Sequence, residues 1–87
     1  MRNQNWVYMD GYDEVRTAET HELVFKTDEV ESNEVIDKVV TMHNECKTWS
    51  EIDDYLLDEC LCTSDEREII LESAYKNYYS KLPLQKL

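Results

Sequence analysis

Hydrophobic and polar residues follow two different periods along the chain. Over residues 5–26, aromatic and β-branched residues form short runs, Asn5–Met9 and His21–Lys26, of the kind that predict β-strands. The pair Asp10-Gly11 after the first run is favoured by a type I′ hairpin turn. We therefore expect an antiparallel hairpin or a three-stranded meander at about residues 5–26, with Tyr12–Thr17 as the return strand.

The apolar residues that follow recur at helical spacing and predict a first helix at about residues 29–46. Asp28 or Ser32 is expected to cap its start. Charged residues lie on the outer side of this helix. Its apolar side carries seven residues: Val35, Ile36, Val39, Val40, Met42, His43 and Cys46.

Two capping boxes predict the later helices, at about residues 49–61 and 64–82. In Thr48-Trp49-Ser50-Glu51 and again in Thr63-Ser64-Asp65-Glu66, a threonine precedes a glutamate by three positions. The expected buried faces are Trp49, Ile52, Leu56 and Cys60 on one helix, and Leu71, Ala74, Tyr75, Tyr78 and Leu82 on the other. The chain is thus predicted to be one α+β domain, residues 1–87, with an N-terminal antiparallel hairpin or meander followed by three α-helices packed on one face.

Acidic residues outnumber basic ones by 20 to nine, and the formal net charge is −11. All of the acids lie between Asp10 and Glu72, together with only five of the bases. Such a field repels nucleic acids and anionic membranes and attracts basic protein surfaces. With no long apolar stretch and no signal-like N-terminus, the expected location is the cytoplasm, or the host cytoplasm if a phage encodes the protein.

Turning the apolar faces inward brings a row of acids outward on each of the last two helices. Acids three or four positions apart stand about 5–6 Å from one another at Cβ, so a groove that binds phosphates would accept such a row. Helix faces that only contact solvent are often acidic too, but the excess of acidic residues over the whole chain favours mimicry of nucleic-acid phosphates. Ile69 is expected to point outward among these charges as an apolar hot spot, although lone exposed apolar residues are common. The expected partner-binding residues are Glu51, Asp54, Asp58, Asp65, Glu68, Ile69 and Glu72.

Zinc binding and catalysis are both disfavoured. His43, Cys46, Cys60 and Cys62 are four potential zinc ligands, but their spacing fits poorly and three of them fall on apolar faces, so we expect no metal and no cofactor. The chain contains no phosphate-binding loop, dinucleotide-binding glycine motif or nucleophile elbow, so we expect that the protein is not an enzyme. Tyr75 and Tyr78 have the spacing of a core stripe, whereas Tyr79 is expected to be exposed.

The acid-dense span Glu51–Glu72 in so small a chain resembles the small acidic inhibitors that phages and mobile elements encode, such as anti-CRISPR proteins and uracil-DNA glycosylase inhibitors. This resemblance in size and charge implies a non-catalytic DNA mimic. It would bind a basic, nucleic-acid-binding surface of a target, for example a CRISPR effector or another nuclease, and block nucleic-acid access. Lys76, Lys81 and Lys86 limit the mimicry to one side of the molecule. The alternative is an acidic adaptor or regulatory protein-interaction domain, either monomeric or homodimeric.

Overall fold

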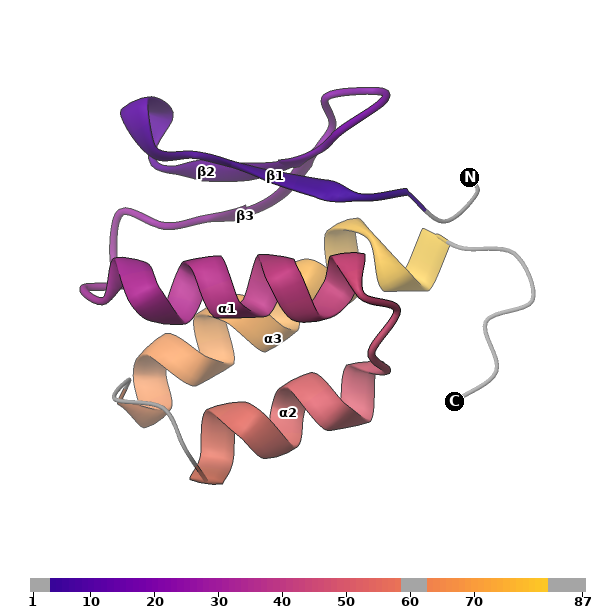
Figure 1. Ribbon diagram of the computed structural model, residues 1–87. Coiled ribbons are helices and arrows are strands. Elements are labelled where there is room, and N and C mark those ends of the chain that lie inside the picture. The colour runs from indigo at the N-terminus through magenta and orange to yellow at the C-terminus, as the bar shows by residue number, and fades with distance from the viewer. Residues whose placement is uncertain (1–3, 59–62, 82–87) are drawn as a thin grey trace.

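The computed structural model describes residues 4–58 and 63–81 (Figure 1). Within them it shows the predicted α+β fold, a three-stranded antiparallel sheet followed by three α-helices. The strands are β1 (Trp6–Met9), β2 (Glu14–Thr17) and β3 (Leu23–Lys26), paired in the order β1-β2-β3. The meander expected at residues 5–26 is therefore confirmed.

The register of the strands gives the sheet one apolar face. Trp6 is paired with Thr17, and Val15 with Phe25, and all four side chains are almost fully buried. Side chains alternate between the two faces of a sheet, so Val7, the neighbour of Trp6, points the other way. Val7 on that outer face is 41% exposed. Val24, the neighbour of Phe25 on β3, is nevertheless fully buried.

The loop between β1 and β2 differs from the two-residue type I′ turn that Asp10-Gly11 predicted. Four residues separate the strands: a 3₁₀ turn, η1 (Asp10–Tyr12), and then Asp13, whose φ of 54° is left-handed. Gly11 does not have a positive φ. An aspartate tolerates the left-handed region better than most residues, and β2 begins at Glu14, two residues later than expected.

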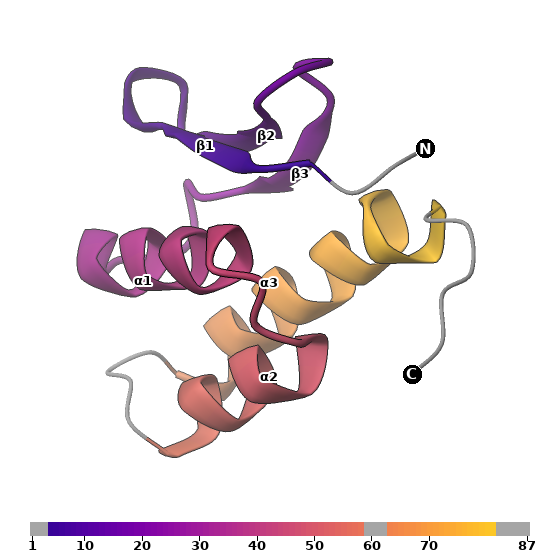
Figure 2. The same ribbon diagram turned by 45° about the vertical axis from the view of Figure 1, so that its right-hand side comes forward.

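The helices lie on the same side of the sheet, but in two layers. They are α1 (Asn33–Asn44), α2 (Trp49–Asp58) and α3 (Ser64–Asn77), and a short 3₁₀ helix, η2 (Tyr79–Lys81), follows α3. α1 contacts β1, α3 contacts β3, and α2 contacts α1 and α3. Two views show α1 and α3 between the sheet and α2 (Figures 1 and 2). The prediction that all three helices lie on one side of the sheet is thus confirmed. However, α2 does not pack on the sheet, and it forms the outermost of three layers after the sheet and the α1–α3 layer.

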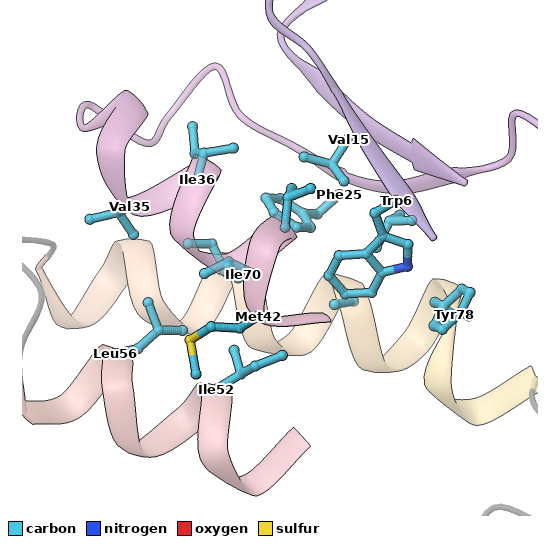
Figure 3. Close-up of a cluster of buried hydrophobic side chains, with 14 of the residues drawn as sticks. Trp6, Val15, Phe25, Val35, Ile36, Met42, Ile52, Leu56, Ile70 and Tyr78 are labelled. Atoms are coloured by element: carbon cyan, nitrogen blue, oxygen red, sulfur yellow. The ribbon is translucent and has the colours of Figure 1, made fainter. Parts of the chain in front are cut away.

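The core is continuous through these layers (Figure 3). Phe25 of the sheet meets Ile36 of α1 and Ile70 of α3, and Met42 reaches from α1 toward Ile52 and Leu56 of α2. Each of these side chains is at least nine-tenths buried. Burying a large aliphatic or aromatic side chain contributes about 1.5–3 kcal/mol, so these contacts attach α2 firmly although it is remote from the sheet.

α1 begins and ends through local hydrogen bonds. The Ser32 hydroxyl accepts from the Val35 N–H at 3.3 Å, so Ser32 rather than Asp28 is the cap. At the other end the Cys46 N–H donates to the His43 carbonyl (3.0 Å) and the Lys47 N–H to that of Met42 (2.9 Å). This is a Schellman motif, which requires a left-handed residue, and Cys46 takes that role with φ 67°.

The same turn corrects the prediction for Cys46. The helix stops at Asn44, so Cys46 never reaches the apolar face and its side chain is exposed. The six other residues expected on that face, Val35, Ile36, Val39, Val40, Met42 and His43, are all buried.

The C-terminal tyrosines exchange the positions that the sequence predicted. The buried face of α3 runs through Ile70 and Ala74 to Tyr78, about one position from the expected one, and Tyr75 is 43% exposed. α3 ends at Asn77 and the chain tightens into η2, which rotates Tyr79 inward to 6% exposure. The prediction that Tyr75 is core was wrong because the buried face of α3 runs through Ile70 rather than Leu71. The prediction that Tyr79 is exposed was wrong because it extended one unbroken helix through residue 82.

The segment before β1 is fixed to the helices through the backbone of Gln4. Its carbonyl accepts from His43 Nε2 (2.6 Å) and from the Tyr78 hydroxyl (3.1 Å), and its N–H donates to that same hydroxyl (2.6 Å). His43 Nδ1 lies 3.1 Å from the Tyr79 hydroxyl. The His43 ring stacks on Trp6 with 3.8 Å between centroids. We call this group of five residues the Gln4–His43 junction.

Two helix-terminal asparagines protect the outer edges of the sheet. Asn44, the last residue of α1, accepts from the Trp6 N–H (2.7 Å) and donates to the Trp6 carbonyl (3.1 Å), as a neighbouring strand would. Asn77, the last residue of α3, donates to the Val24 carbonyl on the opposite edge (2.9 Å). Buried edge groups need such partners because an unpaired backbone group away from water costs about 1–3 kcal/mol.

The junction makes folding sensitive to pH. Burial lowers the pKa of His43 below its ordinary value of 6.5, and the bond to the Gln4 carbonyl opposes this only partly. The unfolded chain therefore binds a proton more readily than the folded one, so stability is lost as pH falls from about 6.5 through the folded pKa. We expect the urea midpoint to drop between pH 7.5 and 5.5.

His43→Gln serves as the comparison, since an amide can still donate to Gln4 but does not titrate. Carboxylates titrate in both proteins, so the smaller decline expected in the variant isolates the imidazole. Parallel declines would contradict this account, as would a His43 pKa above 6.5 in an NMR titration.

Candidate functional site

α2 is the element that displays the acidic row. The predicted capping box starts it: the Thr48 N–H donates to Glu51 Oε1 (2.8 Å), and the Glu51 N–H donates to the Thr48 hydroxyl (3.1 Å). Ile52 and Leu56 turn inward and are buried. The helix has four acids and no base, and as the outermost layer it must present most of that charge to solvent.

The acids of α2 fall into two groups. Glu51 and Asp53 are already engaged: the Thr48 N–H lowers the pKa of Glu51, and Asp53 pairs with Arg67 of α3 at 2.9 Å. Asp54 and Asp58 are exposed, and their carboxylates make no hydrogen bond or ion pair with any other residue that the structure describes. These two carboxylates, one helical turn apart, are therefore available to a partner.

The acids predicted on α3 also lie outward. Asp65, Glu68 and Glu72 are all exposed. Their neighbour Glu66 is only 8% exposed, and its carboxylate accepts from the N–H groups of both Thr63 and Glu31, each at 2.8 Å. The bond from Glu31, followed by that from Thr63, lowers the pKa of Glu66. The second capping box is thus confirmed, and its glutamate also holds the loop before α1.

Ile69 is more enclosed than the sequence suggested. It was expected to point outward, but the buried face of α3 is centred on Ile70, and this leaves Ile69 partly buried. The large apolar side chain exposed beside the acids is instead Leu57 of α2, at 58%. Leu57 follows Asp54 by three positions and directly precedes Asp58.

A groove runs between α1 and α2 and takes in the predicted row on α2. Glu51, Asp54 and Asp58 line it from α2, and Lys38 and Lys47 line it from α1 and the turn that follows. Met42 and Tyr55 complete its lining, and its volume is about 350 Å³. The structure thus brings three of the seven predicted residues into one concave site; Asp65, Glu68, Ile69 and Glu72 are not among its lining residues.

The candidate zinc ligands do not form a site in the described part of the chain. Both ring nitrogens of His43 are engaged inside the core, whereas Cys46 is on the surface. Cys60 and Cys62 lie outside the described residues. Among residues 4–58 and 63–81, no three His, Cys, Asp or Glu side chains are grouped closely enough to hold a metal ion.

No helix within the described residues has the length and apolar character to cross a membrane. Comparison with protein-family models, with curated proteins and with solved structures gives no match to the chain. The resemblance to small acidic inhibitors therefore rests on size and charge, and the function remains a proposal.

Sequence reasoning missed two features of the site. The first is that Lys38 and Lys47 line the groove opposite the acids of α2, which can be predicted only once α1 and α2 are known to be adjacent. Leu57 was detectable: it lies outside the face formed by Ile52 and Leu56, and periodicity alone assigns it to solvent.

The two kinds of acid can be separated by stability measurements. We expect Glu66→Ala to cost about 1–3 kcal/mol, because two backbone N–H groups lose their acceptor. Glu68→Ala, which changes the charge equally on the same helix, should stay within about 0.5 kcal/mol. Equal losses in chemical denaturation would show that Glu66 has no special structural role.

Proposed function

We propose that this protein is a non-catalytic inhibitor that binds a basic, nucleic-acid-binding surface of another protein, such as a CRISPR effector or another nuclease. Its carboxylates would occupy the lysine and arginine side chains that normally hold phosphates. Access of nucleic acid to the target would be blocked by occlusion. The inhibitor itself needs no metal, no cofactor and no contact with nucleic acid.

The observation that carries this proposal is the outermost position of α2, with the carboxylates of Asp54 and Asp58 exposed and unpaired among the residues that the structure describes. Intramolecular ion pairs would reduce the charge available to a partner, as Arg67 does for Asp53. The four acids of α2 have no base on their own helix, so the helix presents a field that favours cationic surfaces. α3 extends the acidic surface with Asp65, Glu68 and Glu72.

Affinity would come from few contacts. Charge pairs at the rim of an interface mainly speed association, whereas apolar side chains packed against the partner slow dissociation. Leu57 is the exposed apolar residue within the acids of α2 and takes the anchoring role that the sequence assigned to Ile69.

A second function, an acidic homodimeric adaptor, is favoured by a different surface. Val7 is 41% exposed on the outer face of the sheet, and Tyr12 in the adjoining η1 turn is 73% exposed. Sedimentation separates the two proposals. We expect a monomer, whereas a stable dimer weakened by Val7→Lys would favour the adaptor.

The inhibitor proposal is tested by location-specific charge reversal. The protein is used to capture binding proteins from a host extract, and each captured protein is then purified. Association rates are measured for wild type and for the Asp54→Lys/Asp58→Lys double variant. The rate should fall at least about tenfold for the variant, and by a similar factor for wild type between low and high salt, because steering of charged partners depends on ionic strength. A short DNA duplex should compete with the inhibitor for the target.

The matched control is Asp28→Lys/Glu29→Lys, which makes the same change in net charge at exposed positions between β3 and α1. We expect its rate to stay within about threefold of wild type, since attraction weakens with distance beyond a Debye length. The proposal fails if both double variants behave alike, if salt has no effect, or if DNA and inhibitor bind the target together.

A further inference from the structure

The groove between α1 and α2 has a lining that matches one kind of side chain. We propose that it receives an arginine of the basic partner, with the guanidinium on Asp54 and Asp58 and the aliphatic stem over Met42 and Tyr55. This inference rests on the proposed function and identifies the group that the acidic site recognises.

The shape of the groove limits its occupant. A volume of about 350 Å³ is at the low end for ligand pockets, enough for one long side chain rather than a helix. Met42 is itself nine-tenths buried, and its thioether lies between α1 and α2 (Figure 3), so Met42 and Tyr55 add an apolar part to a lining that is otherwise charged. A side chain with an aliphatic stem and a cationic end would match both parts of this lining.

Arginine satisfies this requirement better than lysine. Its planar guanidinium stacks on aromatic rings and presents a fork of N–H donors, and Tyr55 and the two aspartates supply partners for both. A lysine ammonium is a more strongly hydrated point charge and cannot stack on Tyr55 as a planar guanidinium can. An acidic side chain of the partner would be repelled by the three carboxylates of the groove. A neutral side chain would bring no cation to Asp54 and Asp58.

Lys38 and Lys47 restrict the direction of approach. Both residues are exposed, and within residues 4–58 and 63–81 neither side-chain ammonium group forms a hydrogen bond or a close ion pair. Their ammonium groups repel a second cation on the α1 side. In the proposed complex, the same ammonium groups would donate to carbonyl oxygens of the peptide that carries the arginine.

The test uses two blocked tripeptides, acetyl-Gly-Arg-Gly-amide and acetyl-Gly-Lys-Gly-amide, titrated while methionine methyl signals are followed by NMR. Met42 reports on the groove, and Met9 on β1 serves as an internal control. We expect a saturable shift of Met42 with the arginine peptide, a dissociation constant at least about threefold lower than for the lysine peptide, and no shift of Met9.

Two double variants locate the binding site. Asp54→Asn/Asp58→Asn should weaken the arginine peptide by about fivefold or more, as expected when two ion pairs are lost. Asp65→Asn/Glu72→Gln removes the same charge from α3 and should leave the affinity within about twofold. Equal affinity for both peptides, equal shifts of Met9 and Met42, or equal weakening by both double variants would overturn the proposal.

The outcomes also separate this inference from the proposed function. If the groove binds the arginine peptide selectively but no basic protein partner is found, the groove inference is supported and the inhibitor proposal is refuted. Capture of a basic target that Asp54→Asn/Asp58→Asn binds unchanged would refute the groove and leave occlusion by another acidic surface.

Discussion

The hydrogen bonds that Gln4 makes with His43 and Tyr78 are the constraint on which the arrangement of layers depends. The Gln4 carbonyl can only accept, so His43 Nε2 must carry the proton, and the neutral ring then accepts from Tyr79 through Nδ1. One contact thus joins the start of the sheet, the end of α1 and the end of α3. Trp6 stacks on the imidazole, and this contact helps to hold β1, α1 and α3 in one relative position.

The relative position of these elements determines where the acidic residues of α2 reach the surface. α1 ends beneath β1, where Asn44 pairs with the strand edge, and the left-handed Cys46 then directs the chain away from the sheet. α2 consequently packs on the far side of α1 and α3 and becomes the exposed layer. Acids with structural roles, such as Glu51 and Glu66, are bonded to backbone N–H groups. The carboxylates of Asp54 and Asp58 make no such bond within the described residues, and in the proposed complex they are the groups that would meet the partner.

Local signals in the sequence predicted local structure well. Both capping boxes, the meander and the buried face of α1 follow from interactions between residues close in the chain, and all are present. The errors lie where tertiary contacts override local periodicity. Tyr79 turns inward because a 3₁₀ turn brings its hydroxyl to His43, 36 residues away, and Cys46 turns outward because a Schellman motif ends α1 early. The α2 row was predictable from helical spacing, but the groove was not, because its lysines come from another helix.

The central proposal is that α2 is the contact surface and that the carboxylates of Asp54 and Asp58 would face the partner. Amide hydrogen exchange, compared between the free protein and its complex with a purified basic target, tests this most directly. The account predicts slower exchange over residues 49–58 in the complex, with the outer sheet face around Val7 and the η1 turn unchanged. Protection confined to Val7 and η1, with α2 exchanging as in the free protein, would contradict it.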